Sequence, residues 1–305
     1  MPKKRKSVKR SPQPAVEDEV VNQSAHDEQQ DGNRGDGETS ARNDNDETAP
    51  EQQEVEHFEF PFNNKSIVCE RRGKSGQPSL IWTHGAGGGL EAPATKDFAD
   101  GFAEKAGIVS FKGAMNLVSR TKAFHAVVEH ESFDAALGGR SMGARAACIA
   151  ATQEDRTTKA VVLVSFPLVG GKKQDSREQI LLDLPDDIDV LFISGSKDSM
   201  CDLEQLADVT ARMEAHSWLV TIDAADHGMN WKGKAKDSAQ EMRRMTGALA
   251  ADWLDHRDSN KRHCLVSYDE DAGKISCDGW QEGERVAEKA VDETAPPAKK
   301  RRKTK

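Results

Sequence analysis

The chain has 305 residues, of which 43 are Lys or Arg and 52 are Asp or Glu, and its formal net charge is −9. This acidic balance argues against direct nucleic-acid binding by a folded domain. Five scattered cysteines without CxxC spacing, and no apolar run of 18 residues, predict no disulfide framework, no metal, no cofactor and no membrane span.

The two ends of the chain are basic. Residues 1–10 and 299–305 each hold six Lys or Arg, whereas residues 17–56 carry 14 acids, 2 bases and no aromatic residue. The acidic stretch cannot bury enough apolar surface to offset its ordering entropy, so we predict that residues 1–56 are disordered. Short basic runs without aromatics favour nuclear-localisation signals recognised by an import receptor, and we expect a nuclear protein, with or without a cytoplasmic pool. The predicted signal residues are Lys3, Lys4, Arg5, Lys6, Lys299, Lys300, Arg301, Arg302 and Lys303.

Between the ends, strand-like and helix-like apolar patterns alternate. We expect strands at 58–60, 66–69, 80–83, 108–111, 133–137, 160–166, 190–194 and 218–222, and helices at 95–105, 117–128, 144–151, 202–215 and 238–256. This alternation predicts one α/β domain over 57–257, with a mostly parallel, doubly wound sheet and helices on both faces. The apolar residues beyond 257 are too sparse for a core of their own, so 258–305 is predicted to be a largely disordered tail.

The most informative motif is Gly139-Arg140-Ser141-Met142-Gly143, which lies between a predicted strand and a small-residue helix. This is the setting of a hydrolase nucleophile elbow, in which a strained turn lifts a serine hydroxyl above the sheet. The two glycines leave room where a Cβ would clash with neighbouring backbone. Met142 then offers its N–H to an oxyanion at the positive end of the following helix.

Two further residues complete a candidate triad. Asp198 follows the strand at 190–194, and His227 follows the strand at 218–222. The chain order Ser141, Asp198, His227 is that of the α/β hydrolases, and each residue lies past the carboxyl end of a predicted strand. Asp226 and Asp202 are alternative acids, although Asp226 adjoins the histidine and Asp202 falls inside the next helix.

A glycine-rich segment, Thr83-His84-Gly85-Ala86-Gly87-Gly88-Gly89, follows an earlier strand. Its position predicts that Ala86 supplies the second oxyanion N–H. Phosphate binding is the alternative, but the spacing is neither Walker nor dinucleotide type. We interpret His84 as a structural residue that holds this loop rather than as a base. The predicted pocket residues are His84, Gly85, Arg140, Phe166, Pro167 and Leu168.

Several motifs together resemble one α/β-hydrolase-like family. They are residues 83–89, 112–117, 138–145, 165–168 and 195–201. The family groups testis-expressed protein 30 with regulatory subunit 3 of the NSL histone-acetyltransferase complex, and it is related to dienelactone hydrolases. The resemblance spans about 57–257 and implies an α/β-hydrolase fold, with the triad positions at Ser141, Asp198 and His227. The chain departs from the pattern in a shortened stretch at 107–112, and it has Ser where dienelactone hydrolases often carry Cys.

These observations lead to two hypotheses of function. The first is a serine hydrolase of carboxylesterase type, acting on a small ester or thioester through a Ser-His-Asp acyl-enzyme mechanism. The alternative is a catalytically silent hydrolase-fold scaffold that contacts other subunits of a nuclear, chromatin-associated histone-acetyltransferase complex. An intact triad favours the enzyme, because a scaffold has no need of all three residues in register.

Overall fold

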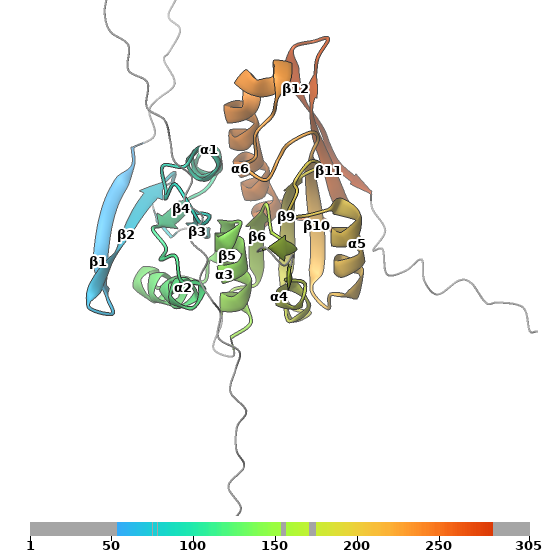
Figure 1. Cartoon of the computed structure of the whole chain (residues 1–305). Coiled ribbons are helices and arrows are strands. Elements are labelled where there is room, and N and C mark those ends of the chain that lie inside the picture. Colours follow the sequence, from blue (N-terminus) through green and yellow to red (C-terminus); the bar gives the residue numbers. More distant parts are fainter. Residues whose placement is uncertain (1–53, 75, 78, 154–156, 171–174, 283–305) are drawn as a thin grey trace, which may run out of the picture. The chain divides into compact units, whose positions relative to one another are not determined.

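The computed structural model describes residues 54–74, 76–77, 79–153, 157–170 and 175–282 (Figure 1). The strands are β1 (Glu56–Phe62), β2 (Lys65–Arg72), β3 (Leu80–Thr83), β4 (Ile108–Phe111), β5 (Ala136–Arg140), β6 (Ala160–Val164), β7 (Val169–Gly170), β8 (Asp175–Ser176), β9 (Asp189–Gly195), β10 (His216–Ile222), β11 (Lys261–Asp269) and β12 (Lys274–Glu282). The helices are α1 (Pro93–Ala103), α2 (Leu117–Glu131), α3 (Met142–Ala151), α4 (Gln179–Leu182), α5 (Leu203–Arg212) and α6 (Ala239–His256), with a 3₁₀ turn at Gly233–Ser238. The two predicted basic signals, and the acidic stretch up to residue 53, lie outside the described residues.

Ten of the strands form one sheet in the order β1-β2-β4-β3-β5-β6-β9-β10-β11-β12. The neighbours from β4 to β11 pair in parallel, and β1, β2 and β12 join antiparallel at the two edges. The central strand β6 is buried along its whole length, as expected for a parallel strand covered on both faces. The mostly parallel sheet predicted from the sequence is confirmed.

Two hydrophobic cores lie on opposite faces of this sheet (Figure 1). On one face the sheet packs against α2, α3, α4 and α5, through residues such as Phe124, Ala147 and Leu206. On the other face it packs against α1 and α6, through Phe98 and Trp253. The prediction of helices on both faces is therefore also confirmed, and the carboxyl ends of the parallel strands share one edge of the sheet.

The predicted tail boundary at residue 257 is wrong for residues 261–282. They form β11 and β12, and β11 pairs in parallel with β10. Cys264 and Val266 are buried in the core on the α1/α6 face, and Trp280 packs against it. The few apolar residues of this segment need no core of their own, because they extend a sheet that already has one. Residues 283–305 lie outside the described part of the chain.

The irregular segment after β6 contains the short β7–β8 pair and helix α4, none of which has a clear periodic signal in the sequence. The shortened stretch at 107–112 still forms β4, which pairs with both β2 and β3. No helix among the described residues has both the length and the apolar character that a membrane crossing requires.

Candidate active site

Ser141 lies on a strained turn between β5 and α3. Its φ of 51° and ψ of −108° are unusual for a residue with a side chain. Two backbone hydrogen bonds hold it there: its N–H donates to the carbonyl of Val164 at 2.9 Å, and its carbonyl accepts from the N–H of Arg145 at 3.2 Å. Although Ser141 is the N-cap of α3, its side chain makes no capping bond, so the hydroxyl is free for another partner.

The two glycines of the elbow occupy positions with no room for a Cβ. A Cβ on Gly139 would collide with the backbone of Gly143. A Cβ on Gly143 would lie 2.5 Å from the carbonyl oxygen of Thr83 and 2.8 Å from that of His84. Helix α3 therefore packs directly against the end of β3 and the start of the glycine-rich loop, because position 143 has only a hydrogen.

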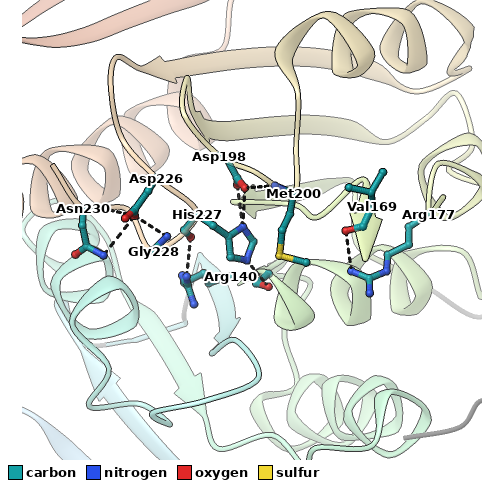
Figure 2. Close-up of polar contacts among 10 residues, drawn as sticks. Arg140, Val169, Arg177, Asp198, Met200, Asp226, His227, Gly228 and Asn230 are labelled. Atoms are coloured by element: carbon teal, nitrogen blue, oxygen red, sulfur yellow. Dashed lines mark hydrogen bonds and ion pairs between the residues drawn. The ribbon is translucent and has the colours of Figure 1, made fainter. Parts of the chain in front are cut away.

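His227 connects the serine to a buried carboxylate. Its Nε2 lies 3.0 Å from the Oγ of Ser141, and its Nδ1 lies 3.0 and 2.9 Å from the two carboxylate oxygens of Asp198. The side chain of Asp198 is fully buried and that of His227 is 22% exposed. Figure 2 shows the carboxylate of Asp198 directed at the imidazole, with the N–H of Met200 donating to the same carboxylate at 2.8 Å. The three residues form one hydrogen-bonded line.

The loops after β9 and β10 are tied to each other, which fixes the acid relative to the histidine. Ser196 donates from its hydroxyl to the carboxylate of Asp223 and accepts from the N–H of Ala224 at 2.7 Å. Arg140, the residue before the serine, donates from its guanidinium to the backbone carbonyl of His227 at 2.6 Å (Figure 2). Burial lowers the pKa of Arg140, and the nearby charges of Asp198 and Asp226 oppose that shift.

The two alternative acids have other roles. Asp226 accepts hydrogen bonds from the N–H groups of Gly228 and Asn230, and so shapes the turn that follows the histidine (Figure 2). Asp202 caps α5, accepting from the N–H groups of Glu204 and Gln205 at 3.0 Å. The structure therefore brings Asp198, and neither alternative, to the imidazole.

His84 holds two loops together. Its Nδ1 is 2.7 Å from the carbonyl of Gly85, and its Nε2 accepts the N–H of Gly113 at 3.1 Å. These contacts require a neutral ring with its proton on Nδ1. Burial, reinforced by the positive charge of Arg120, lowers the pKa of His84 to about 4. The residue is a structural link rather than a base, because both of its ring nitrogens already have backbone partners.

Arg120 was not anticipated from the sequence, although it organises the glycine-rich loop. Its guanidinium is fully buried and donates to the backbone carbonyls of His84, Gly85, Gly113 and Ala114. Burial lowers its pKa to about 10. The sequence does contain a pattern that indicates this burial. Position 120 lies three, four and seven residues before the apolar positions 123, 124 and 127 of α2, so its side chain lies on the helix face that packs against the core.

The backbone C=O groups of His84 and Gly85 in the glycine-rich loop point toward Arg120, and this sets the direction of the loop's own backbone N–H groups. In a trans peptide the C=O and the following N–H point in opposite directions. Because the carbonyl of Gly85 accepts from both His84 and Arg120, the N–H of Ala86 points away from them. A Cβ built on Gly85 would lie 3.6 Å from the Cβ of Ser141, which places this peptide next to the nucleophile.

The remaining predicted pocket residues follow β6. Phe166, Pro167 and Leu168 are buried, and Phe166 and Leu168 belong to the core on the α2/α3 face. Burial in the core leaves the side chains of Phe166 and Leu168 little surface for a ligand, and the place of these three residues in a substrate pocket stays a prediction. A depression of about 600 Å³ lies beside the turn that follows His227, lined by residues such as Asn230, Trp231 and Arg243 and by none of the triad residues.

Within the described part of the chain, no cluster of three or more His, Cys, Asp or Glu side chains is arranged to hold a metal ion. The side chains that the structure brings together at the elbow are a serine hydroxyl, an imidazole and a carboxylate. Such a set can deliver a nucleophile.

Residues 113–255 match the model of a protein family described as an alpha/beta hydrolase domain. The chain has an α/β-hydrolase fold. The matched segment contains Ser141, Asp198 and His227 together with the strands that carry them.

Solved structures of low sequence identity share this α/β-hydrolase fold. An α/β serine hydrolase homologue from Coxiella burnetii is 16% identical with a TM-score of 0.50, covering 64% of this chain and 96% of its own. The esterase domain of a Rhodothermus marinus protein is 17% identical with a TM-score of 0.50, and the match covers 66% of this chain and 97% of that domain. Haloalkane dehalogenase DbeA from Bradyrhizobium elkani is 9% identical with a TM-score of 0.52, covering 66% and 98%. Proteins with different named activities share the fold, so the chemistry must be argued from the site.

Proposed function

We propose that this protein is a serine hydrolase that cleaves a small ester or thioester through an acyl-enzyme intermediate. The observation that carries the proposal is the line from Ser141 Oγ to His227 Nε2 at 3.0 Å, and from His227 Nδ1 to Asp198 at 2.9 to 3.0 Å. These are the distances at which an imidazole can accept the hydroxyl proton while a carboxylate holds the ring.

In the proposed first step, the Oγ of Ser141 attacks the acyl carbonyl and His227 takes its proton at Nε2. Asp198 accepts the Nδ1–H throughout, which keeps Nε2 free as an acceptor and stabilises the imidazolium that forms. His227 then gives the proton to the leaving oxygen or sulfur, and the acyl group stays on the serine. Water attacks this acyl-enzyme in the second step, with His227 again acting as base.

The negative charge that develops on the acyl oxygen needs donors already in place. Met142 is the first residue of α3, so its N–H has no partner within the helix and lies at the positive end of the helix dipole. Ala86 is the proposed second donor, since the carbonyl of the preceding residue is held by Arg120 on the opposite side. Each such donor lowers the barrier by roughly 2.7–4 kcal/mol in acyl transfer. On this proposal Arg120 is a positioning residue, because it sets the loop without touching the substrate.

The test is covalent labelling of the full chain with a fluorophosphonate, followed by intact mass and peptide mapping. We expect one adduct, on Ser141, and none on the Ser141→Ala variant. The matched control is Ser199→Ala, because Ser199 is an exposed serine in the loop after β9 and has no side-chain hydrogen bond among the described residues. That variant should label as the wild type does.

The thermal stability of Ser141→Ala decides how the labelling is interpreted. We expect it to melt close to the wild type, because the hydroxyl caps no helix and makes a single side-chain hydrogen bond. A large loss of stability would instead mark Ser141 as a structural residue. No adduct on folded wild type would refute the hydrolase proposal. That result would favour a silent scaffold in a nuclear histone-acetyltransferase complex, which the narrower resemblance to testis-expressed protein 30 and NSL subunit 3 implies.

A further inference from the structure

The C-terminal hairpin of the domain brings two cysteines into contact. Cys264 of β11 and Cys277 of β12 have their sulfurs 3.5 Å apart. Cys264 is 2% exposed and buried in the core, whereas Cys277 is exposed at the outer edge strand of the sheet (Figure 1). The pair therefore combines one thiol that solutes can reach with a second thiol directly behind it.

An irregularity in the pairing explains why these two side chains meet. Cys264 is opposite Trp280, but Val266 is opposite Cys277, so β12 has one extra residue between the two pairs. Gly279 lies in this bulge with a φ of 69°, a conformation that glycine adopts without strain. The extra residue shifts Cys277 along the strand and turns its side chain onto the face where Cys264 lies.

The environment of the pair makes one sulfur an anion more readily than the other. The hydrogen bond between the two sulfurs, with help from the backbone of Gly279, lowers the pKa of Cys277 to about 6 against the opposing effect of burial. The same contact, together with burial, raises the pKa of Cys264. The other three cysteines are buried, and desolvation raises the pKa of Cys69 and Cys201 to about 12. Thiolate character and exposure thus coincide at Cys277 alone among the five.

We propose that Cys277 and Cys264 form a peroxide-oxidisable pair, with Cys277 as the attacking thiolate and Cys264 as the resolving thiol. The Cys277 thiolate attacks hydrogen peroxide, forming an S–O bond as the O–O bond breaks, and the departing hydroxide takes up a proton as water. The Cys264 thiol then attacks the sulfenic sulfur and displaces a second water. The two sulfurs lose two electrons in total, peroxide gains them, and a disulfide links β11 to β12.

The pair stands close to the segment that carries the triad histidine. Val266, two residues after Cys264, accepts the N–H of Asp223 at 2.8 Å at the start of the turn that leads to His227. The oxidation site nevertheless stands on the geometry of the hairpin alone, and it holds whether or not the triad is active.

The test treats the full-length, reduced protein with hydrogen peroxide, blocks the remaining thiols with an alkylating agent and maps the peptides. Trypsin cuts after Lys274, between the two cysteines, so the disulfide would join peptides 263–274 and 275–285. We expect this linked pair in wild type, at the mass of the two peptides less two hydrogen atoms, and its loss on adding dithiothreitol. Cys69, Cys148 and Cys201 should stay reduced, and they should react with the alkylating agent only after the protein is unfolded.

Two variants test the order of attack. In Cys264→Ser the reaction should stop at a sulfenic acid on Cys277, which dimedone traps, whereas Cys277→Ser should trap no dimedone and form no link. The alkylation rate of Cys277 in wild type should also rise through a midpoint near pH 6 rather than above 8. Oxidation spread over the buried cysteines, or dimers linked through Cys277 without the 264–277 link, would overturn the proposal. Because Cys277 is exposed, Cys277→Ser should fold normally, and its melting temperature checks this.

Discussion

Replacing Asp198 with Asn tests the triad while changing almost no atoms. One carboxylate oxygen of Asp198 accepts the N–H of Met200 at 2.8 Å and lies 3.0 Å from His227 Nδ1, and the other oxygen lies 2.9 Å from the same nitrogen. An asparagine keeps its oxygen on Met200, so its NH₂ group takes the place beside the imidazole. This NH₂ group can donate to Nδ1 only when Nδ1 carries no proton, which favours the tautomer with the proton on Nε2. That tautomer cannot accept a proton from the hydroxyl of Ser141.

The expected loss is large because the base is removed, not merely weakened. The equivalent change in the serine proteases lowers kcat by about 10⁴-fold, which corresponds to about 5 kcal/mol in the barrier. We expect a loss of that order in the acylation rate of Asp198→Asn, measured with a p-nitrophenyl ester or as the rate of fluorophosphonate labelling. The melting temperature should change little, since the hydrogen bond to Met200 remains.

The matched control is Asp226→Asn, at the residue immediately before the histidine in the sequence. Asp226 accepts N–H groups from Gly228 and Asn230, and an asparagine oxygen can accept the same bonds. Its activity should therefore stay within about threefold of the wild type. Equal losses in the two variants, or more than a tenth of the activity left in Asp198→Asn, would refute the assignment of Asp198 as the acid.

Three more outcomes are expected. Gly143→Ala should lower the free energy of unfolding by roughly 1–3 kcal/mol in urea melts, because its Cβ meets two carbonyls, whereas Gly87→Ala, with nothing within 4 Å, should be neutral. As the pH falls from 6.5 toward 4, His84 takes up a proton in the unfolded chain but stays neutral in the folded state, so the free energy of unfolding should fall by up to about 3 kcal/mol. In His84→Gln the free energy of unfolding should change less steeply with pH. Deleting residues 1–10 and 299–305 should move a fluorescent fusion out of the nucleus, and continued nuclear accumulation would contradict the import signals.

The sequence by itself was sufficient for the fold class and for the order of the triad residues. Strands such as 160–164 are local and strongly patterned, and their alternation with helices leaves few arrangements other than a parallel sheet. Ser141, Asp198 and His227 each follow a strand, and carboxyl ends of parallel strands meet at one edge. Their convergence could therefore be predicted without coordinates.

Tertiary structure decided the features that depend on contacts between distant segments. Arg120 reaches carbonyls more than 30 residues away, and only the packing of α2 shows which ones. Residues 261–282 looked too poor in apolar side chains to fold, since the core that receives Cys264 and Val266 belongs to earlier strands. The contact between Cys264 and Cys277 likewise depends on a one-residue bulge. Local patterns specify elements, but burial and register are properties of the assembled sheet, because each residue's partners come from elsewhere in the chain.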